Sequence, residues 1–241
     1  MNKKAQVTLI IAIAVFIVII AGLIFYVANY YKKSSIEPLV FEKASIENYI
    51  NNCIKKTAED GLRQFGKQGF VVENVKNYEF LNISENQTIF DNSKIPSIEQ
   101  IQNELSFYVD SNLNTCLKDF RDFKRQGWDV EKGNINAKTQ INQEDVVFDV
   151  NFPIKVSDKV STLNFDRFVI KLDIRLKYIY DLINKIVDFD SKYKRQVDMT
   201  MLNAHDVNVT IFEVQDSLVY VIDDSKSLIM NEPYRFVLSI K

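Results

Sequence analysis

The sequence predicts an α+β domain behind a single N-terminal transmembrane helix. Residues 7–28 form an apolar run without charge or proline. Apolar residues then recur at helical spacing over 46–65 and 101–120, and strict alternation begins after Gly127. A helical pair, an antiparallel β-meander, a third helix and C-terminal strands together indicate the α+β class.

The apolar run is long enough to cross a bilayer. Its 22 residues reach about 33 Å as a helix, which matches the hydrocarbon core. A basic tail, residues 1–6, precedes it, and a juxtamembrane linker, residues 29–38, follows with tyrosines and lysines. The run is too long for a cleaved secretory signal and ends in bulky residues, so we expect it to stay attached. Lysines flank both ends, so the positive-inside rule does not orient it.

Two helices are predicted next. The first keeps helical spacing from Ile46 to Phe65, and Gly66 is expected to end it. A short extended piece, residues 70–72, follows. Ser97 and Gln100 have the spacing of a capping box for the second helix, whose apolar stripe runs from Ile101 to Phe120.

The rest of the chain predicts strands around a third helix. Residues 135–141 and 146–156 alternate on either side of a polar turn, and Pro153 indicates an edge position or a bulge. The next strand changes phase near residues 166–167, which also indicates a bulge. A helix over 176–187 and strands over 207–214, 218–222 and 234–240 complete a domain of residues 39–241.

The N-terminus resembles a known signal type. Lys4-Ala5-Gln6-Val7-Thr8, followed by the apolar run, is similar to the class III signal peptides of archaeal type IV pilin-like proteins. The resemblance implies processing between Ala5 and Gln6, a retained helix and an extracytoplasmic domain, with the N-terminus in the cytoplasm. The fifth residue after that cut is Ile10, where pilins usually have a glutamate that neutralises a neighbouring N-terminus. Filament assembly therefore stays open.

Further short segments resemble a group of uncharacterised archaeal single-pass membrane proteins. They are Cys53-Ile54, Thr57-Ala58-Glu59, Cys116-Leu117 with Phe120, Asp145-Val146, Phe152-Pro153-Ile154 and Pro233-Tyr234-Arg235-Phe236. The likeness supports a single-pass plasma-membrane topology, and because the group has no assigned activity it implies nothing about mechanism.

The two cysteines are the strongest prediction of covalent chemistry. Cys53 and Cys116 each fall on the apolar stripe of a predicted helix. Antiparallel packing of those helices would let the sulfurs meet, and a disulfide would persist only on the oxidising side of a membrane. With the domain inside the cell, two buried thiols would be expected instead.

Three N-x-S/T sequons begin at Asn82, Asn86 and Asn208. They would suit N-glycosylation of an exported chain, but this composition produces about as many by chance. They permit glycosylation without indicating it.

No segment specifies a reaction, a metal or a cofactor. His205 is the sole histidine and has Asp206 beside it, but no nucleophile elbow accompanies them, so a surface-turn histidine is the better interpretation. Asp223-Asp224, where a strand is expected to end, could hold Ca²⁺, yet a solvated turn is favoured. The same preference applies to Asp188 and Asp190, which lie near a predicted helix end.

Nucleic-acid binding is not expected either, because lysine and arginine total 30 against 32 acidic residues. Gly66-Lys67-Gln68-Gly69 matches the loop of KH domains, but a helix stop explains it better. The basic cluster at residues 192–195 suits the end of a helix.

These features predict a binding domain of the cell envelope, without evident catalysis. Its partners would be the lipid bilayer and an envelope protein, a surface polymer or further copies of the chain. The alternatives are a type IV pilin-like subunit and an enzyme whose site has no local signature. An enzyme should show a deep polar cleft with convergent carboxylates.

Overall fold

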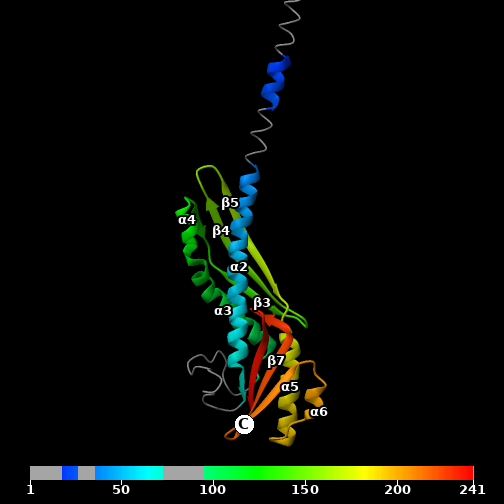
Figure 1. The fold of residues 1–241 in the computed structure, drawn as a ribbon. Coiled ribbons are helices and arrows are strands. Elements are labelled where there is room, and N and C mark those ends of the chain that lie inside the picture. The colour runs from blue at the N-terminus through cyan, green and yellow to red at the C-terminus, as the bar shows by residue number, and fades with distance from the viewer. Residues whose placement is uncertain (1–17, 27–35, 73–94, 241) are drawn as a thin grey trace, which may run out of the picture. The chain divides into compact units, whose positions relative to one another are not determined.

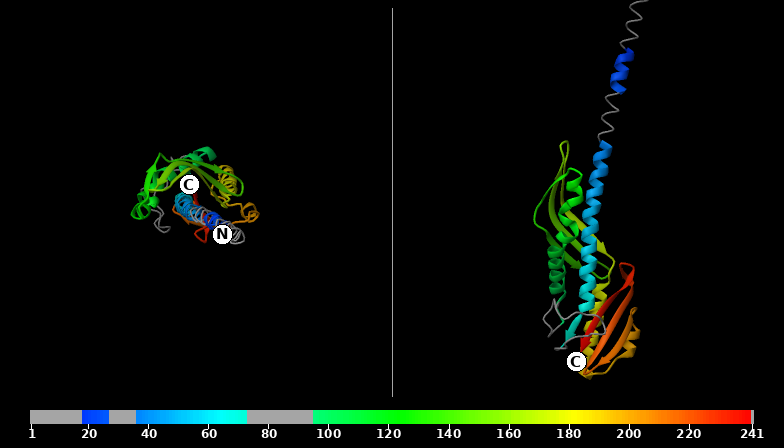
Figure 2. Two further views of the ribbon diagram at one scale, coloured as in Figure 1. Left: turned by 90° about the horizontal axis from the view of Figure 1, so that it is seen from above. Right: turned by 60° about the vertical axis from the view of Figure 1, so that its left-hand side comes forward.

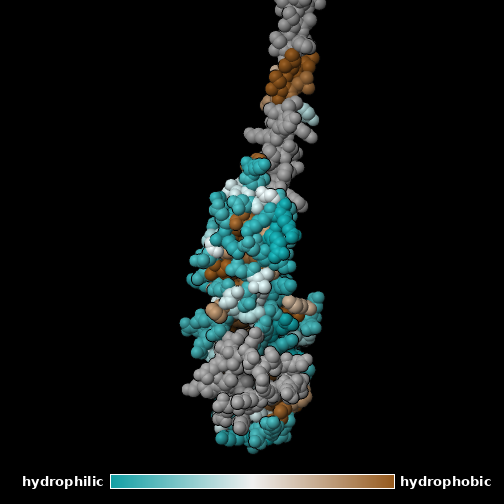
Figure 3. Space-filling model, turned by 90° about the vertical axis from the view of Figure 1, so that its left-hand side faces the viewer, coloured by the Kyte–Doolittle hydropathy of each residue, from teal (hydrophilic) through white to brown (hydrophobic). Residues whose placement is uncertain are grey.

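The computed structural model describes residues 18–26, 36–72 and 95–240. The chain divides into two compact units, 1–48 and 49–241. Residues 18–26 are helical and their apolar side chains are exposed, as the brown segment in Figure 3 shows. Among the described residues, no helix is both long and apolar enough to cross a membrane. The rest of the apolar run and the predicted processing site at Ala5 and Gln6 lie outside the described residues.

The architecture is α+β, as predicted, with the elements arranged as in Figure 1. In chain order they are α2 (Ile36–Gln68), β1 (Phe70–Val72), α3 (Ile98–Leu117), the 3₁₀ turn η2 (Lys118–Phe120), α4 (Arg121–Arg125), β2 (Asp129–Lys132), β3 (Asn136–Ile141), β4 (Val146–Ser157), β5 (Thr162–Leu172), α5 (Leu176–Tyr193), α6 (Met199–Asn203), β6 (Asn208–Val214), β7 (Ser217–Ile229) and β8 (Glu232–Ile240).

The end of α2 is set by contact with β8. The prediction that Gly66 ends the helix is wrong, because α2 continues to Gln68. Gly69 supplies the left-handed residue instead, with φ +57°, and its N–H donates to the Phe65 carbonyl at 2.9 Å. A Cβ on Gly66 would lie 2.2 Å from the Arg235 carbonyl oxygen, and one on Gly69 would lie 1.6 Å from that of Val237. Both glycines therefore allow the helix end to approach β8 closely.

The C-terminal sheet has the strand order β1-β8-β7-β6. Strands β6, β7 and β8 form an antiparallel meander, while β1 pairs in parallel with β8. Strand β7 has an irregularity between Asp224 and Leu228, so the predicted strand end at Asp223-Asp224 is wrong. Helix α5 lies along this sheet (Figure 1), and its buried face includes Ile179 and Ile183.

The second sheet, which we call the central sheet, is organised around β4. Strand β5 pairs with β4 along its length, and β2 and β3 pair with successive halves of the same strand. Pro153 therefore does not lie in an edge strand. It lies at a bulge, because the β4–β5 register shifts between Asn151 and Ile154, opposite Asp166. The predicted irregularities at Pro153 and at residues 166–167 are the same bulge.

Helix α3 covers the outer edge of β3 (Figure 2). The backbone N–H groups of Ala137, Thr139 and Ile141 donate to Asp110 Oδ1, Ser106 Oγ and Gln102 Oε1, at 2.7, 2.9 and 3.0 Å. The acceptors are four residues apart along α3, a rise of about 6.0 Å, and the donors are two residues apart along β3, a rise of about 6.8 Å. These two spacings are similar enough for three successive hydrogen bonds to form. Side chains of a helix thus satisfy an edge that would otherwise be open to pairing with another strand.

Candidate functional site

A disulfide joins α2 to α3. The sulfur atoms of Cys53 and Cys116 are 2.13 Å apart and their Cα atoms 5.5 Å apart. The two cysteines are 63 residues apart in the sequence, so the disulfide links covalently two helices that are distant along the chain. The two helical stripes predicted this pairing, because each places its cysteine toward the neighbouring helix.

A hollow lies beside this bond, and we call it the disulfide groove. It encloses about 550 Å³ and is formed mainly by α2 and α3. Its walls combine the two cysteines with aromatic, polar and charged side chains: Tyr49, Lys56, Thr57, Asp60, Arg63, Tyr108, Asn112, Thr115, Lys118, Asp122 and Met230. Met230 comes from the β7–β8 turn, where Met230 and Asn231 both have positive φ.

One end of the groove holds a closed polar network. Tyr108 Oη donates to Asp60 Oδ2 at 2.6 Å, and Gln64 Nε2 donates to Tyr108 Oη at 2.8 Å and to Asp60 Oδ2 at 3.1 Å. Arg63 pairs with Asp60 Oδ1 at 2.6 Å. Burial would raise the pKa of Asp60, but the hydrogen bonds from Arg63, Tyr108 and Gln64 outweigh it and lower that pKa. Burial and the Asp60 carboxylate raise the pKa of Tyr108.

The same network is held in place by backbone packing. A Cβ on Gly61 would lie 2.7 Å from Tyr108 Cδ1, so the ring rests directly on the α2 backbone. Asn112 Nδ2 donates to the Tyr108 carbonyl at 2.8 Å. Tyr108 is therefore fixed at both its ring and its hydroxyl, and the groove wall is formed in advance of any ligand.

The other end of the groove has a strained backbone. Lys118, Asp119 and Phe120 have φ values of 46°, 54° and 54°, a left-handed run that costs on the order of 1 kcal/mol or more per residue. Buried Phe120 lies against Tyr49, with ring centroids 6.0 Å apart, and Tyr49 Oη donates to the Leu117 carbonyl at 2.8 Å. These contacts hold the turn that presents Lys118 to the groove.

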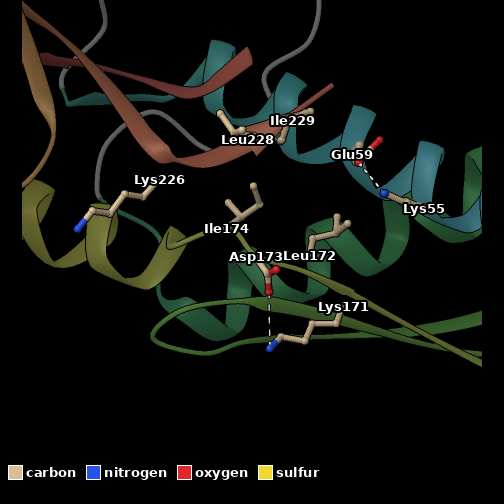
Figure 4. Close-up of a pocket in the computed structure, with 9 residues that line it drawn as sticks. All are labelled: Lys55, Glu59, Lys171, Leu172, Asp173, Ile174, Lys226, Leu228 and Ile229. Carbon is tan, nitrogen blue, oxygen red and sulfur yellow. Dashed lines mark ion pairs between the residues drawn. The ribbon is translucent and has the colours of Figure 1, made fainter. Parts of the chain in front are cut away.

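A second hollow, the lysine cleft, lies between α2, the end of β5 and β7, and encloses about 330 Å³ (Figure 4). Four apolar residues, Leu172, Ile174, Leu228 and Ile229, line it together with the charged residues Lys55, Glu59, Lys171, Asp173 and Lys226. In Figure 4 the Lys226 ammonium points away from the centre, and dashed lines pair Lys55 with Glu59 and Lys171 with Asp173. The Glu59 and Asp173 carboxylates are on opposite sides. The two carboxylates of this cleft therefore do not converge.

The expectation that Asp223-Asp224 forms a solvated turn is wrong. Asp224 is fully buried and binds Arg175 through both carboxylate oxygens, at 2.5 and 3.0 Å, while Ser227 Oγ donates to it at 2.6 Å. Burial would raise the pKa of Asp224, but the bonds from Arg175 and Ser227 lower it overall. The neighbouring Asp223 pairs with Arg235 at 2.7 Å. Two arginines therefore hold these carboxylates, and the pair formed by Asp224 connects the start of α5 to β7.

The remaining predicted residues stay apart from both hollows. His205 is half-buried and contacts Tyr178 Oη at 3.0 Å and Lys185 Nζ at 3.3 Å. Burial and Lys185 lower its pKa. Asn208 is exposed at the start of β6, whereas Asn82 and Asn86 lie outside the described residues. Arg195, from the predicted basic cluster, pairs with Glu213. Among the described residues, no group of three or more histidine, cysteine or acidic residues could hold a metal.

Sequence reasoning missed the Asp60–Tyr108 network. Tyr108 belongs to the apolar stripe of its helix by spacing, and Asp60, Arg63 and Gln64 occupy i, i+3 and i+4 positions that share one face of α2. That polar face lies on the same helix as Cys53, and it was the one sequence feature that could have indicated a polar network beside the disulfide. Comparison with protein families, curated proteins and solved structures finds no match for this chain.

Proposed function

We propose that this chain is a single-pass membrane protein whose extracytoplasmic domain binds another component of the cell envelope. Residues 7–28 would form the anchor, because the run is apolar throughout and about as long as the hydrocarbon core is thick. The domain would lie outside the cytoplasm.

The observation that carries the proposal is the bond between Cys53 and Cys116. Disulfides persist on the oxidising side of a membrane and are rare in the cytosol. With a separation of 63 residues, this bond would contribute about 4 kcal/mol in the chain-entropy model. A location in the cell envelope would keep the bond oxidised, so the domain would retain this stabilisation.

Binding is favoured over catalysis by the state of the polar groups. In the disulfide groove, the Asp60 carboxylate accepts from Tyr108 and Gln64, so these three side chains form a rigid wall. In the lysine cleft, the Glu59 and Asp173 carboxylates pair with Lys55 and Lys171 and do not point toward each other. Rigid walls and exposed charges suit recognition of a partner.

The test uses the full chain in its own membranes. A membrane-impermeant amine reagent should label domain lysines in intact cells, and the intact mass without reductant should lack the hydrogens lost on forming the bond. The matched control is the Cys53→Ser, Cys116→Ser double variant. Free thiols in the native protein, together with protection of the lysines until the cells are opened, would contradict the proposal.

A type IV pilin-like subunit is the second candidate. The helix over residues 18–26 exposes large side chains such as Leu23, Ile24 and Phe25, which side-by-side packing of apolar helices would bury. A native N-terminus at Gln6 and filaments that disappear when Ala5 and Gln6 are changed would support it. A monomer that still begins at Met1 would rule it out.

A further inference from the structure

We propose that the disulfide groove is a binding site for an anionic polysaccharide, held by Lys56, Arg63 and Lys118. This inference rests on the extracytoplasmic location proposed above, where such polymers occur, and adds the site and the class of ligand.

The disulfide groove carries positive charge that is available to a ligand. Lys56 and Lys118 are exposed, and among the described residues neither ammonium has an ion-pair or hydrogen-bond partner. Arg63 uses one terminal nitrogen for Asp60 and keeps its other N–H groups free to donate. Three cations therefore line one hollow with donors to spare.

The acids of the groove oppose an anion only weakly. The Asp60 carboxylate is balanced by Arg63 and also accepts from Tyr108 and Gln64, so Lys56 and Lys118 supply the positive charge left unpaired among the described residues while Arg63 adds its unused donors. Asp122 is well exposed and lies 3.8 Å from Arg125. The chain as a whole has a net charge of −2, so the excess of cations in the groove is local and does not reflect the overall composition.

The walls of the groove are long enough for several units of an extended polymer. Along α2 the groove runs from Tyr49 to Arg63, about 21 Å at the helical rise, and along α3 from Tyr108 to Lys118, about 15 Å. Lys118 lies at one end and Arg63 near the other, so the cations are spread along the wall. An extended polymer with repeated negative charges matches this spacing better than a compact anion does.

The groups that line the groove favour sugars over peptides. The groove is lined by helical side chains and one hairpin turn, and none of the described residues in its walls offers a strand edge to pair with an extended peptide backbone. Sugar hydroxyls both donate and accept, and the groove offers both functions. Asn112 Oδ1 has no partner among the described residues and can accept, while the Thr115 hydroxyl is exposed.

The experiment measures binding of the full chain, in detergent and with the disulfide intact, to polygalacturonate, dextran sulfate and neutral dextran. Either anionic polymer should bind and neutral dextran should not, and binding should weaken as salt is raised. The Lys56→Gln, Lys118→Gln variant should bind about 3- to 30-fold more weakly, since exposed charge pairs contribute only modestly each. The Lys159→Gln, Lys192→Gln control removes the same charge from exposed sites outside the groove and should bind as the native chain does.

Three results would overturn the inference: no binding to either anionic polymer, equal losses in the groove variant and the control, or tighter binding of polyglutamate than of both anionic polysaccharides. The last result would assign the groove to an acidic peptide. None of these results would contradict the proposed membrane anchor or the extracytoplasmic location, which the labelling and mass measurements test separately.

Discussion

The hydrogen bond between Asp110 and the edge of β3 allows a sharp test of how α3 holds the central sheet. Asp110 Oδ1 accepts from the Ala137 N–H at 2.7 Å, in a half-buried position. Replacing Asp110 with Ala removes the acceptor and leaves the N–H without its partner, at a cost of about 1–3 kcal/mol in the free energy of unfolding. For a domain of this size, each kcal/mol lowers Tm by about 2–4 °C.

The matched control is Asp110→Asn, which keeps an acceptor oxygen and removes the charge. Burial raises the pKa of Asp110, although the bond from Ala137 lowers it. With a folded pKa above the unfolded one, the native state holds the proton more tightly, and the ionised carboxylate costs stability as the pH rises through the folded pKa. The Asn variant should therefore equal or exceed the native stability at neutral pH, and any advantage should vanish in acid.

The assay combines denaturant unfolding of the full chain, disulfide intact, with hydrogen exchange at the Ala137 amide. Exchange should accelerate in the Asp110→Ala variant and stay slow in Asp110→Asn. Equal stability of the two variants at neutral pH, or an unchanged exchange rate in Asp110→Ala, would refute the view that side chains of α3 satisfy this edge.

Three further predictions use the same unfolding measurement. The Cys53→Ser, Cys116→Ser variant should lose about 4 kcal/mol, and an unchanged midpoint would argue against the chain-entropy account. Asp224→Asn should cost about 3–5 kcal/mol because it removes the closer and fully buried of the two carboxylates that pair with the largely buried Arg175. The native pKa of Asp224 is lowered, so its stabilisation is present above the unfolded pKa of about 3.9 and is lost as the pH falls through the folded pKa; the variant should lack this acid loss. Gly69→Ala should destabilise more than Gly127→Ala, because both have positive φ but only Gly69 touches β8; equal losses would refute the contact.

Local signals in the sequence were reliable where the structure depends on near neighbours. Ser97 and Gln100 form the predicted capping box, with bonds of 3.2 and 2.8 Å, because such a box needs only residues three apart. The helical stripes that carry Cys53 and Cys116 likewise indicated which faces would meet. That part of the candidate site followed from periodicity alone.

The rest of the site depends on residues far apart in the chain. Asp60 and Tyr108 are 48 positions apart, and no pattern within either helix indicates that they share a hydrogen bond. The free cations Lys56 and Lys118 face one groove only because the disulfide and the left-handed turn after α3 place them there.

The sequence by itself determined the α+β class, the order of the longer helices and strands, and the helical stripes that carry Cys53 and Cys116, because these follow from apolar periodicity and local capping. The short elements α4, β2 and α6 were not predicted. Only the tertiary structure decided where α2 ends and how Asp224 is used. Gly69 replaces Gly66 as the stop because β8 lies against both glycines, and Asp224 is buried because the irregularity in β7 brings it to Arg175. Both outcomes depend on close approach between segments distant in sequence, which a local pattern does not encode.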